Sequence, residues 1–109
     1  MRNLILIPLF FFTFCSLSGQ TEQNNRVIIL TDIEADPDDT QSLVRLLLYT
    51  NEIDVKGIVA TTSFWHKTMV NPESIRKVVR AYEKVQPNLA KHDAAYPKAE
   101  TLYPLIKSG

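Results

Sequence analysis

Residues 26–39 read RVIILTDIEADPDD, an apolar run that changes abruptly into an acidic one. The run from Arg26 to Thr31 is apolar without alternation, which predicts a parallel strand covered on both faces. Five carboxylates then fall within the eight residues from Asp32 to Asp39. Directly after them the hydrophobic spacing changes to that of a helix. The stretch therefore predicts a strand, a corner and a helix, which is the opening of an α/β fold.

The rest of the chain continues the alternation of helices and strands. A helix is predicted over 38–51 and a second strand over 53–62. Asn71 and Pro72 are typical of a helix start, and Pro87 predicts where that helix ends. The last predicted helix has an apolar face made of Ala99, Leu102, Tyr103 and Ile106. Together these elements predict the opening βαβα of a Rossmann-like, mostly parallel sheet.

Length and composition limit what the chain can be. Of its 109 residues, 45% are hydrophobic and 22% are charged, which is typical of one small globular domain. Twelve basic residues balance twelve acidic ones, so no overall field favours a nucleic acid or an anionic membrane surface. Two predicted strands are too few for a two-sided parallel sheet. We therefore expect a truncated domain, the first part of a longer one.

The N-terminal segment has the layout of a signal peptide. A short basic start precedes an apolar run of eleven residues, 4–14. A membrane-spanning helix needs about 20 residues, so we predict no stable membrane span. We assign 1–19 to the signal peptide, 20–25 to a linker and 26–109 to the domain, which predicts a secreted or periplasmic protein. The bulky residue before Cys15 disfavours a lipoprotein cleavage site.

Two interpretations fit the acidic residues. Crowded carboxylates repel one another unless a cation lies between them, and ligands that are all oxygen favour Ca²⁺, with Mg²⁺ as the alternative. Ligand sites of open α/β sheets also lie beyond the carboxyl ends of the strands. Helix capping is the other interpretation, because Asp36 and Pro37 followed by acids are typical of a helix start. Capping leaves Asp32 and Glu34 unexplained, so both interpretations stay open.

Two known acidic motifs fit these residues poorly. An EF-hand loop that starts at Asp32 needs Gly at its sixth position and Glu at its twelfth, where Pro37 and Leu43 stand. The Asp-x-Asp corner of haloacid-dehalogenase phosphatases would have Glu34 in place of its second aspartate. A phosphohydrolase with a covalent intermediate on Asp32 is therefore the weakest of the functions considered.

The segment 31–39, TDIEADPDD, resembles the signature of the inosine-uridine nucleoside hydrolase superfamily, Thr-Asp-Ile-Gly-Asn-Asp-x-Asp-Asp. The continuation reads SLVRLLLYTN at 42–51 and GIVATTS at 57–63. It resembles a secreted branch of that superfamily, the cellulose-binding proteins with a nucleoside-hydrolase-like N-terminal domain. Glu34 and Ala35 stand where the signature has Gly and Asn.

The resemblance implies a nucleoside-hydrolase-like fold and a Ca²⁺ that holds the attacking water and the sugar hydroxyls. Carried over by position, it implies Asp32 as metal ligand and general base, and Asp39 as metal ligand. Asp38 would contact a sugar hydroxyl or the metal, and Asp36 would be a helix cap or a partner of the ligands. From its place after the second predicted strand, Trp65 is a candidate for stacking on a sugar or base, with a hydrophobic loop anchor as the alternative.

These observations predict a secreted, metal-dependent hydrolase of N-glycosyl or related carbohydrate bonds. The alternative is a non-catalytic carbohydrate-binding protein, such as a cellulose-binding one, that retains the acidic metal loop. The expected partner is a small sugar, a nucleoside or a polysaccharide, and the sequence leaves the oligomeric state open. Residues 20–109 alone are expected to be inactive, because half a site lacks most of its positioning groups.

Overall fold

The computed structural model describes residues 23–109, and the predicted signal peptide lies outside them. The elements follow in the order β1 (Asn25–Thr31), α1 (Pro37–Leu47), β2 (Ile53–Ala60), α2 (Pro72–His92), α3 (Ala99–Leu102), the 3-10 helix η1 (Tyr103–Leu105) and β3 (Ile106–Ser108). No helix in this range is long and apolar enough to cross a membrane.

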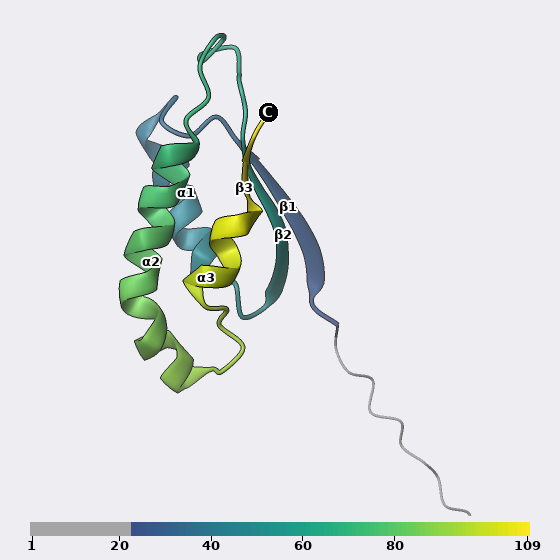
Figure 1. The fold of residues 1–109 in the computed structure, drawn as a ribbon, viewed down its shortest axis with the longest axis vertical. Coiled ribbons are helices and arrows are strands. Elements are labelled where there is room, and N and C mark those ends of the chain that lie inside the picture. The colour runs from purple at the N-terminus through teal and green to yellow at the C-terminus, as the bar shows by residue number, and fades with distance from the viewer. Residues whose placement is uncertain (1–22) are drawn as a thin grey trace, which may run out of the picture.

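The three strands form one parallel sheet in the order β1-β2-β3, so β2 is the central strand. The chain passes through α1 between β1 and β2, and through α2 on its way to β3. Because such crossovers are right-handed, both helices lie on the same face of the sheet, as Figure 1 shows. This arrangement confirms the predicted α/β class and the parallel sheet.

The core lies between the sheet and these helices. Ile58 of β2 and Ile106 of β3 are paired neighbours, and both are buried. Leu43 and Leu47 of α1 belong to the same apolar cluster. The other buried apolar side chains of the cluster are Ile33, Val55, Ala60, Ile75, Val78, Val79, Tyr82, Ala99 and Leu102.

The opposite face of β1 is left uncovered by residues 23–109. Side chains of a strand point alternately to the two faces, and Ile29 packs against the core. Its neighbours Ile28 and Leu30 point the other way and are 65% and 69% exposed. The prediction that this strand is covered on both faces is therefore wrong for the described residues, since their helices lie on one face.

Helix α2 continues past Pro87, where the sequence predicted its end. Proline lacks the N–H that would bond the carbonyl of Glu83, but both residues are exposed, so water can take that bond. Beyond the proline, Leu89 packs against the core, which favours continuing the helix to His92. At the other end, Asn71 precedes the helix but makes no side-chain capping hydrogen bond.

The C-terminal segment contains a strand that the sequence did not predict. Helix α3 has only four residues, and the chain then passes through η1 into β3. Ile106, which was expected on a helix face, pairs instead with Ile58 of β2. That pairing buries Ile106 in the core, and such a tertiary contact outweighs a helical spacing of apolar residues.

Candidate functional site at the carboxyl edge of the sheet

The acidic corner, residues 32–39, connects β1 to α1 at the carboxyl edge of the sheet (Figure 1). The Ala35 N–H donates to the Asp32 carbonyl at 2.9 Å, which closes a turn. Ile33 in that turn is 1% exposed and anchors the corner in the core. Glu34 has a φ of 72°, in the left-handed region that favours glycine. The resembled signature has glycine at this position, and the backbone conformation gives a physical reason for it.

The corner also caps the helix that follows it. Asp36 has extended backbone angles, and Pro37 is the first residue of α1. The Asp36 N–H donates to Asp39 Oδ2 at 3.1 Å, and the Asp39 N–H donates to the Asp36 carbonyl at 3.3 Å. Asp36 therefore stands at the N-cap position of α1. Asp39, predicted as a metal ligand, uses one of its carboxylate oxygens at the helix start.

Asp32 and Asp39 line the same hollow of about 240 Å³ between β1 and α1. Thr31 and Ser42 contribute hydroxyl groups to it. Its apolar lining consists of Ile29, Leu30, Leu43 and Leu46. Asp38 is exposed and is not among the residues that line the hollow. The structure thus brings together the two predicted metal ligands and places Asp38 outside their hollow.

The donor set of the corner fits only part of a metal site. Within residues 23–109 there is no group of three or more His, Cys, Asp or Glu side chains that could hold a metal ion. Ca²⁺ takes about six to eight oxygen ligands, many of them carboxylate oxygens. Asp32 and Asp39 have the right chemistry for such a site, but a complete one needs oxygen ligands from outside the described residues.

The aromatic loop, residues 61–71, connects β2 to α2 at the same edge and extends beyond it (Figure 1). Ser63 Oγ accepts the N–H groups of Trp65 and His66 at 3.1 and 3.0 Å. The Ser63 N–H in turn donates to the His66 carbonyl at 2.9 Å, so the tip of the loop is folded on itself. Phe64 and Trp65 are 72% and 73% exposed. Within residues 23–109 neither ring is buried, so no part of the described chain anchors Trp65.

A hydrogen bond between side chains connects the two loops. Asn71 Nδ2, at the end of the aromatic loop, donates to Glu34 Oε2 at 2.8 Å. At the start of the loop, the Thr61 N–H donates to the Thr31 carbonyl at 2.8 Å. The sequence predicts Asn71 as a helix cap and does not predict the first contact. The signal that could have found it is Glu34, a long polar side chain at a position that favours glycine.

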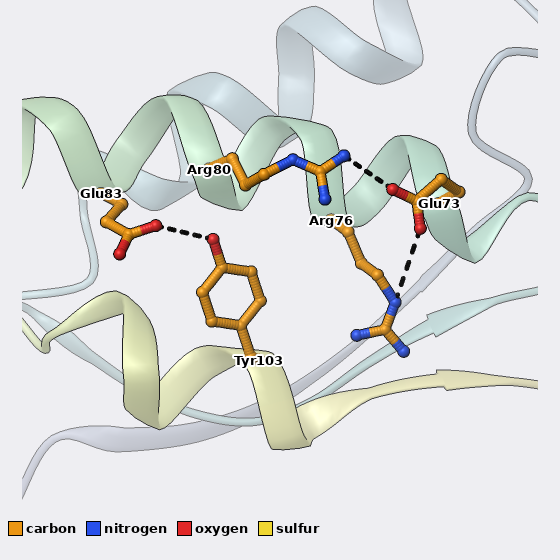
Figure 2. Close-up of polar contacts among 5 residues, drawn as sticks. All are labelled: Glu73, Arg76, Arg80, Glu83 and Tyr103. Atoms are coloured by element: carbon orange, nitrogen blue, oxygen red, sulfur yellow. Dashed lines mark hydrogen bonds and ion pairs between the residues drawn. The ribbon is translucent and has the colours of Figure 1, made fainter.

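Arg76 and Arg80 of α2 belong to a network of ion pairs on the surface of the helix. Glu73 pairs with Arg80 at 2.6 Å and with Arg76 at 3.9 Å (Figure 2). The hydrogen bond that Arg80 donates to the Glu73 carboxylate raises the pKa of Arg80. The Tyr103 hydroxyl donates to Glu83 at 2.8 Å, and loss of hydration together with this bond raises the pKa of Tyr103. These contacts attach η1 to α2 and engage both arginines in ion pairs.

Residues 26–109 match the family described as "Cellulose-binding Sde182, nucleoside hydrolase-like domain". The chain belongs to this family. It is similar to a solved structure, a nucleoside hydrolase-related hypothetical protein from Saccharophagus degradans that is associated with carbohydrate metabolism. The two share 41% sequence identity with a TM-score of 0.76, over 80% of this chain and 21% of that chain. No curated protein matches the sequence.

Family membership confirms the resemblance that the acidic corner and its continuation indicated, and with it the nucleoside-hydrolase-like fold. The chain spans about a fifth of the length of the solved relative. Neither comparison assigns a role to an individual side chain. The roles of Asp32, Asp36, Asp38, Asp39 and Trp65 therefore stay predictions.

Proposed function

We propose that this chain carries the acidic edge of a Ca²⁺-dependent site that hydrolyses N-glycosyl or related carbohydrate bonds. The observation that carries the proposal is the hollow between β1 and α1 that Asp32, directly after β1, shares with Asp39. Open α/β sheets bind their ligands at this edge. Membership of a nucleoside-hydrolase-like family, and similarity to a protein associated with carbohydrate metabolism, support a sugar as the ligand.

The proposed roles differ among the aspartates. Asp32 and Asp39 hold Ca²⁺, or Mg²⁺ as the alternative, together with oxygen ligands from outside residues 23–109. When bound, the cation would polarise water and sugar hydroxyls. Asp32 accepts the proton of the attacking water, and Asp38 contacts a sugar hydroxyl. Asp36 orients Asp39 through the hydrogen bond from its N–H.

The predicted signal peptide adds a location to this proposal. The basic start and the short apolar run of residues 1–19 support export across the inner or plasma membrane. A secreted or periplasmic protein would meet polysaccharides and their fragments before the cell takes them up. The substrate class that we propose is consistent with that location.

A non-catalytic carbohydrate-binding function is the second candidate. The family description names cellulose binding, and the exposed aromatic loop offers a surface for sugars. The described residues also bring only two carboxylates to the hollow. In this case the acidic corner would contact sugar hydroxyls or support the start of α1 without turnover.

Calorimetric titration of Ca²⁺ into the full-length protein, with hydrolysis assays on nucleosides and cello-oligosaccharides, tests the proposal. Asp32→Asn and Asp39→Asn retain side-chain size and remove the negative charge. We expect both to lose Ca²⁺ binding, and Asp32→Asn to lower turnover by about 10²–10⁴-fold, as loss of a general base does. Asp54→Asn is the matched control, because Asp54 forms an exposed ion pair with Lys56 on β2, and it should bind Ca²⁺ like the wild type.

Two results would change the conclusion. Carbohydrate binding without turnover by the wild-type protein would reject the hydrolase and leave the binding function. Ca²⁺ binding that neither Asp32→Asn nor Asp39→Asn affects would assign these aspartates to the turn and the helix cap instead.

A further inference from the structure

We propose that the aromatic loop binds a single, separate glycan chain through the ring of Trp65, rather than the flat face of a crystalline polysaccharide. The inference rests on the proposed carbohydrate function and is common to its catalytic and non-catalytic forms. It concerns the geometry of Phe64, Trp65 and Lys67, which the family comparison does not address.

The loop presents its aromatic side chains to solvent instead of burying them. Phe64 and Trp65 are among the most exposed large hydrophobic residues of the described chain, at 72% and 73%. Such exposure of apolar surface is unfavourable in water and commonly marks a binding surface. The hydrogen bonds of Ser63 hold the backbone beneath the rings, so the loop presents them in a folded arrangement. The rings are therefore available to a ligand without refolding of the tip.

The two rings cannot lie together on a flat surface. Their centroids are 5.1 Å apart and their planes meet at 89°, an edge-to-face pair. The face of a crystalline polysaccharide would be matched by rings that lie in one plane. In a perpendicular pair, only one of the two rings can lie flat against a given sugar ring, and the other ring meets it with its edge. This arrangement fits one chain, with space around it, better than a sheet of chains.

Of the two rings, Trp65 is the one left to stack on a sugar. Lys67 Nζ lies over the Phe64 ring, 4.8 Å from its centroid, and so occupies one face of that ring. Phe64 thus acts as a support that contacts both the lysine and Trp65. Trp65 also has the larger ring, and its indole N–H is a donor for a sugar hydroxyl.

The position of the loop relates this surface to the acidic corner. The hydrogen bond from Asn71 to Glu34 attaches the base of the loop to the turn that contains Asp32. Both loops lie at the carboxyl edge of the sheet (Figure 1). A glycan chain that stacks on Trp65 would therefore lie at the edge where the proposed site is located.

Calorimetry with soluble cellohexaose, paired with pull-down on microcrystalline cellulose, tests the inference. We expect Trp65→Ala to weaken cellohexaose binding about tenfold or more, by analogy with the loss of an aromatic stack on a nucleic-acid base. Trp65→Phe, which keeps an aromatic face, should restore most of the affinity. Tyr49→Ala is the control, because Tyr49 is also exposed, at 59%, but follows α1 at the other end of the sheet.

The outcomes separate this inference from the proposed function. If the wild type binds cellohexaose and Trp65→Ala binds it equally well, the inference is wrong and the carbohydrate function stands. If the wild type binds crystalline cellulose but not cellohexaose, the single-chain preference is wrong. If the wild type binds neither, the carbohydrate function and this inference both fail.

Discussion

The two loops at the carboxyl edge of the sheet are built in opposite ways. The acidic corner buries Ile33 in the core and begins α1 with its own backbone and the Asp39 carboxylate. The aromatic loop leaves Phe64 and Trp65 in solvent and keeps its shape through Ser63. One loop is thus continuous with the folded core, whereas the other is a projection that folds on itself.

Because of this difference, substitutions in the two loops should have different effects. Those in the acidic corner affect stability, and those in the aromatic loop affect ligand recognition. A substitution in the acidic corner changes core packing or helix capping along with any role in chemistry. A substitution of the exposed rings changes little besides the surface that a ligand meets. Effects on activity in the acidic corner therefore need a parallel measurement of the free energy of unfolding.

The largest expected effect is a contrast in stability between the two loops. Ile33→Ala removes a side chain that is 1% exposed and should lower the free energy of unfolding by about 2–5 kcal/mol. Trp65→Ala removes a larger side chain but should change it by no more than about 0.5 kcal/mol. Urea denaturation of both variants measures the contrast. Equal losses of stability would show that the aromatic loop packs against the fold in solution.

A smaller effect is expected at Glu34, where the two loops meet. Both Glu34→Ala and Glu34→Gly remove the hydrogen bond from Asn71, but only glycine accepts a φ of 72° without strain. We expect the glycine variant to be more stable than the alanine variant by about 1 kcal/mol. Thermal unfolding of the pair measures this difference.

Ala35→Gly provides the control for that comparison. Glu34 is the only non-glycine residue with positive φ in residues 23–109, so glycine at Ala35 should destabilise the protein by about 0.5–1 kcal/mol. If Glu34→Gly and Ala35→Gly destabilise the protein equally, the positive φ at residue 34 is not kept in solution.

The smallest effect on stability is expected at Asp93, which follows α2. Its carboxylate has only structural hydrogen bonds, so it serves as a comparison for the carboxylates of the acidic corner. The Ala95 N–H at 2.9 Å and Asn51 Nδ2 at 3.0 Å lower its pKa, in that order of importance. A lowered pKa in the folded state stabilises the fold above the unfolded-state pKa of about 3.9, and this contribution is lost as pH falls through the folded-state pKa. Asn51→Ala should therefore reduce the urea midpoint more at pH 6 than at pH 2.5. A reduction that is independent of pH would contradict this role of the ionised carboxylate.

Local patterns account for the parts of the fold that the sequence predicted. Neighbouring residues are enough to predict the strand before the acidic corner. They are also enough to predict the helix that starts at Pro37. Pro37 fits the first turn of a helix, and Asp36 is a good cap wherever that helix packs. The three-residue strand β3 exists only because β2 pairs with it, so Ile106 taken alone fits a helix equally well. Likewise, the effect of Pro87 depends on whether the freed carbonyl faces water, which the sequence does not show.

Of the candidate site, too, the sequence predicts some parts and not others. The shared edge of the two loops follows from the order of strands and helices, because carboxyl ends of parallel strands meet at one edge. Asp32 and Asp39 lie on either side of one corner, and the structure places both in one hollow. The contact from Asn71 to Glu34 depends on the path of a loop without regular structure. The sequence alone therefore does not predict that these two side chains meet.

The uncovered face of β1 bears on how the chain behaves in solution. Ile28 and Leu30 stand side by side on it at 65% and 69% exposure. Covering an apolar side chain of this size contributes about 1.5–3 kcal/mol. Any apolar surface that fits the sheet would therefore gain by docking there, including the same face of a second molecule. We expect segment 23–109 on its own to bind hydrophobic dyes at this face, and the full-length protein, in which further chain covers the face, to bind fewer of them.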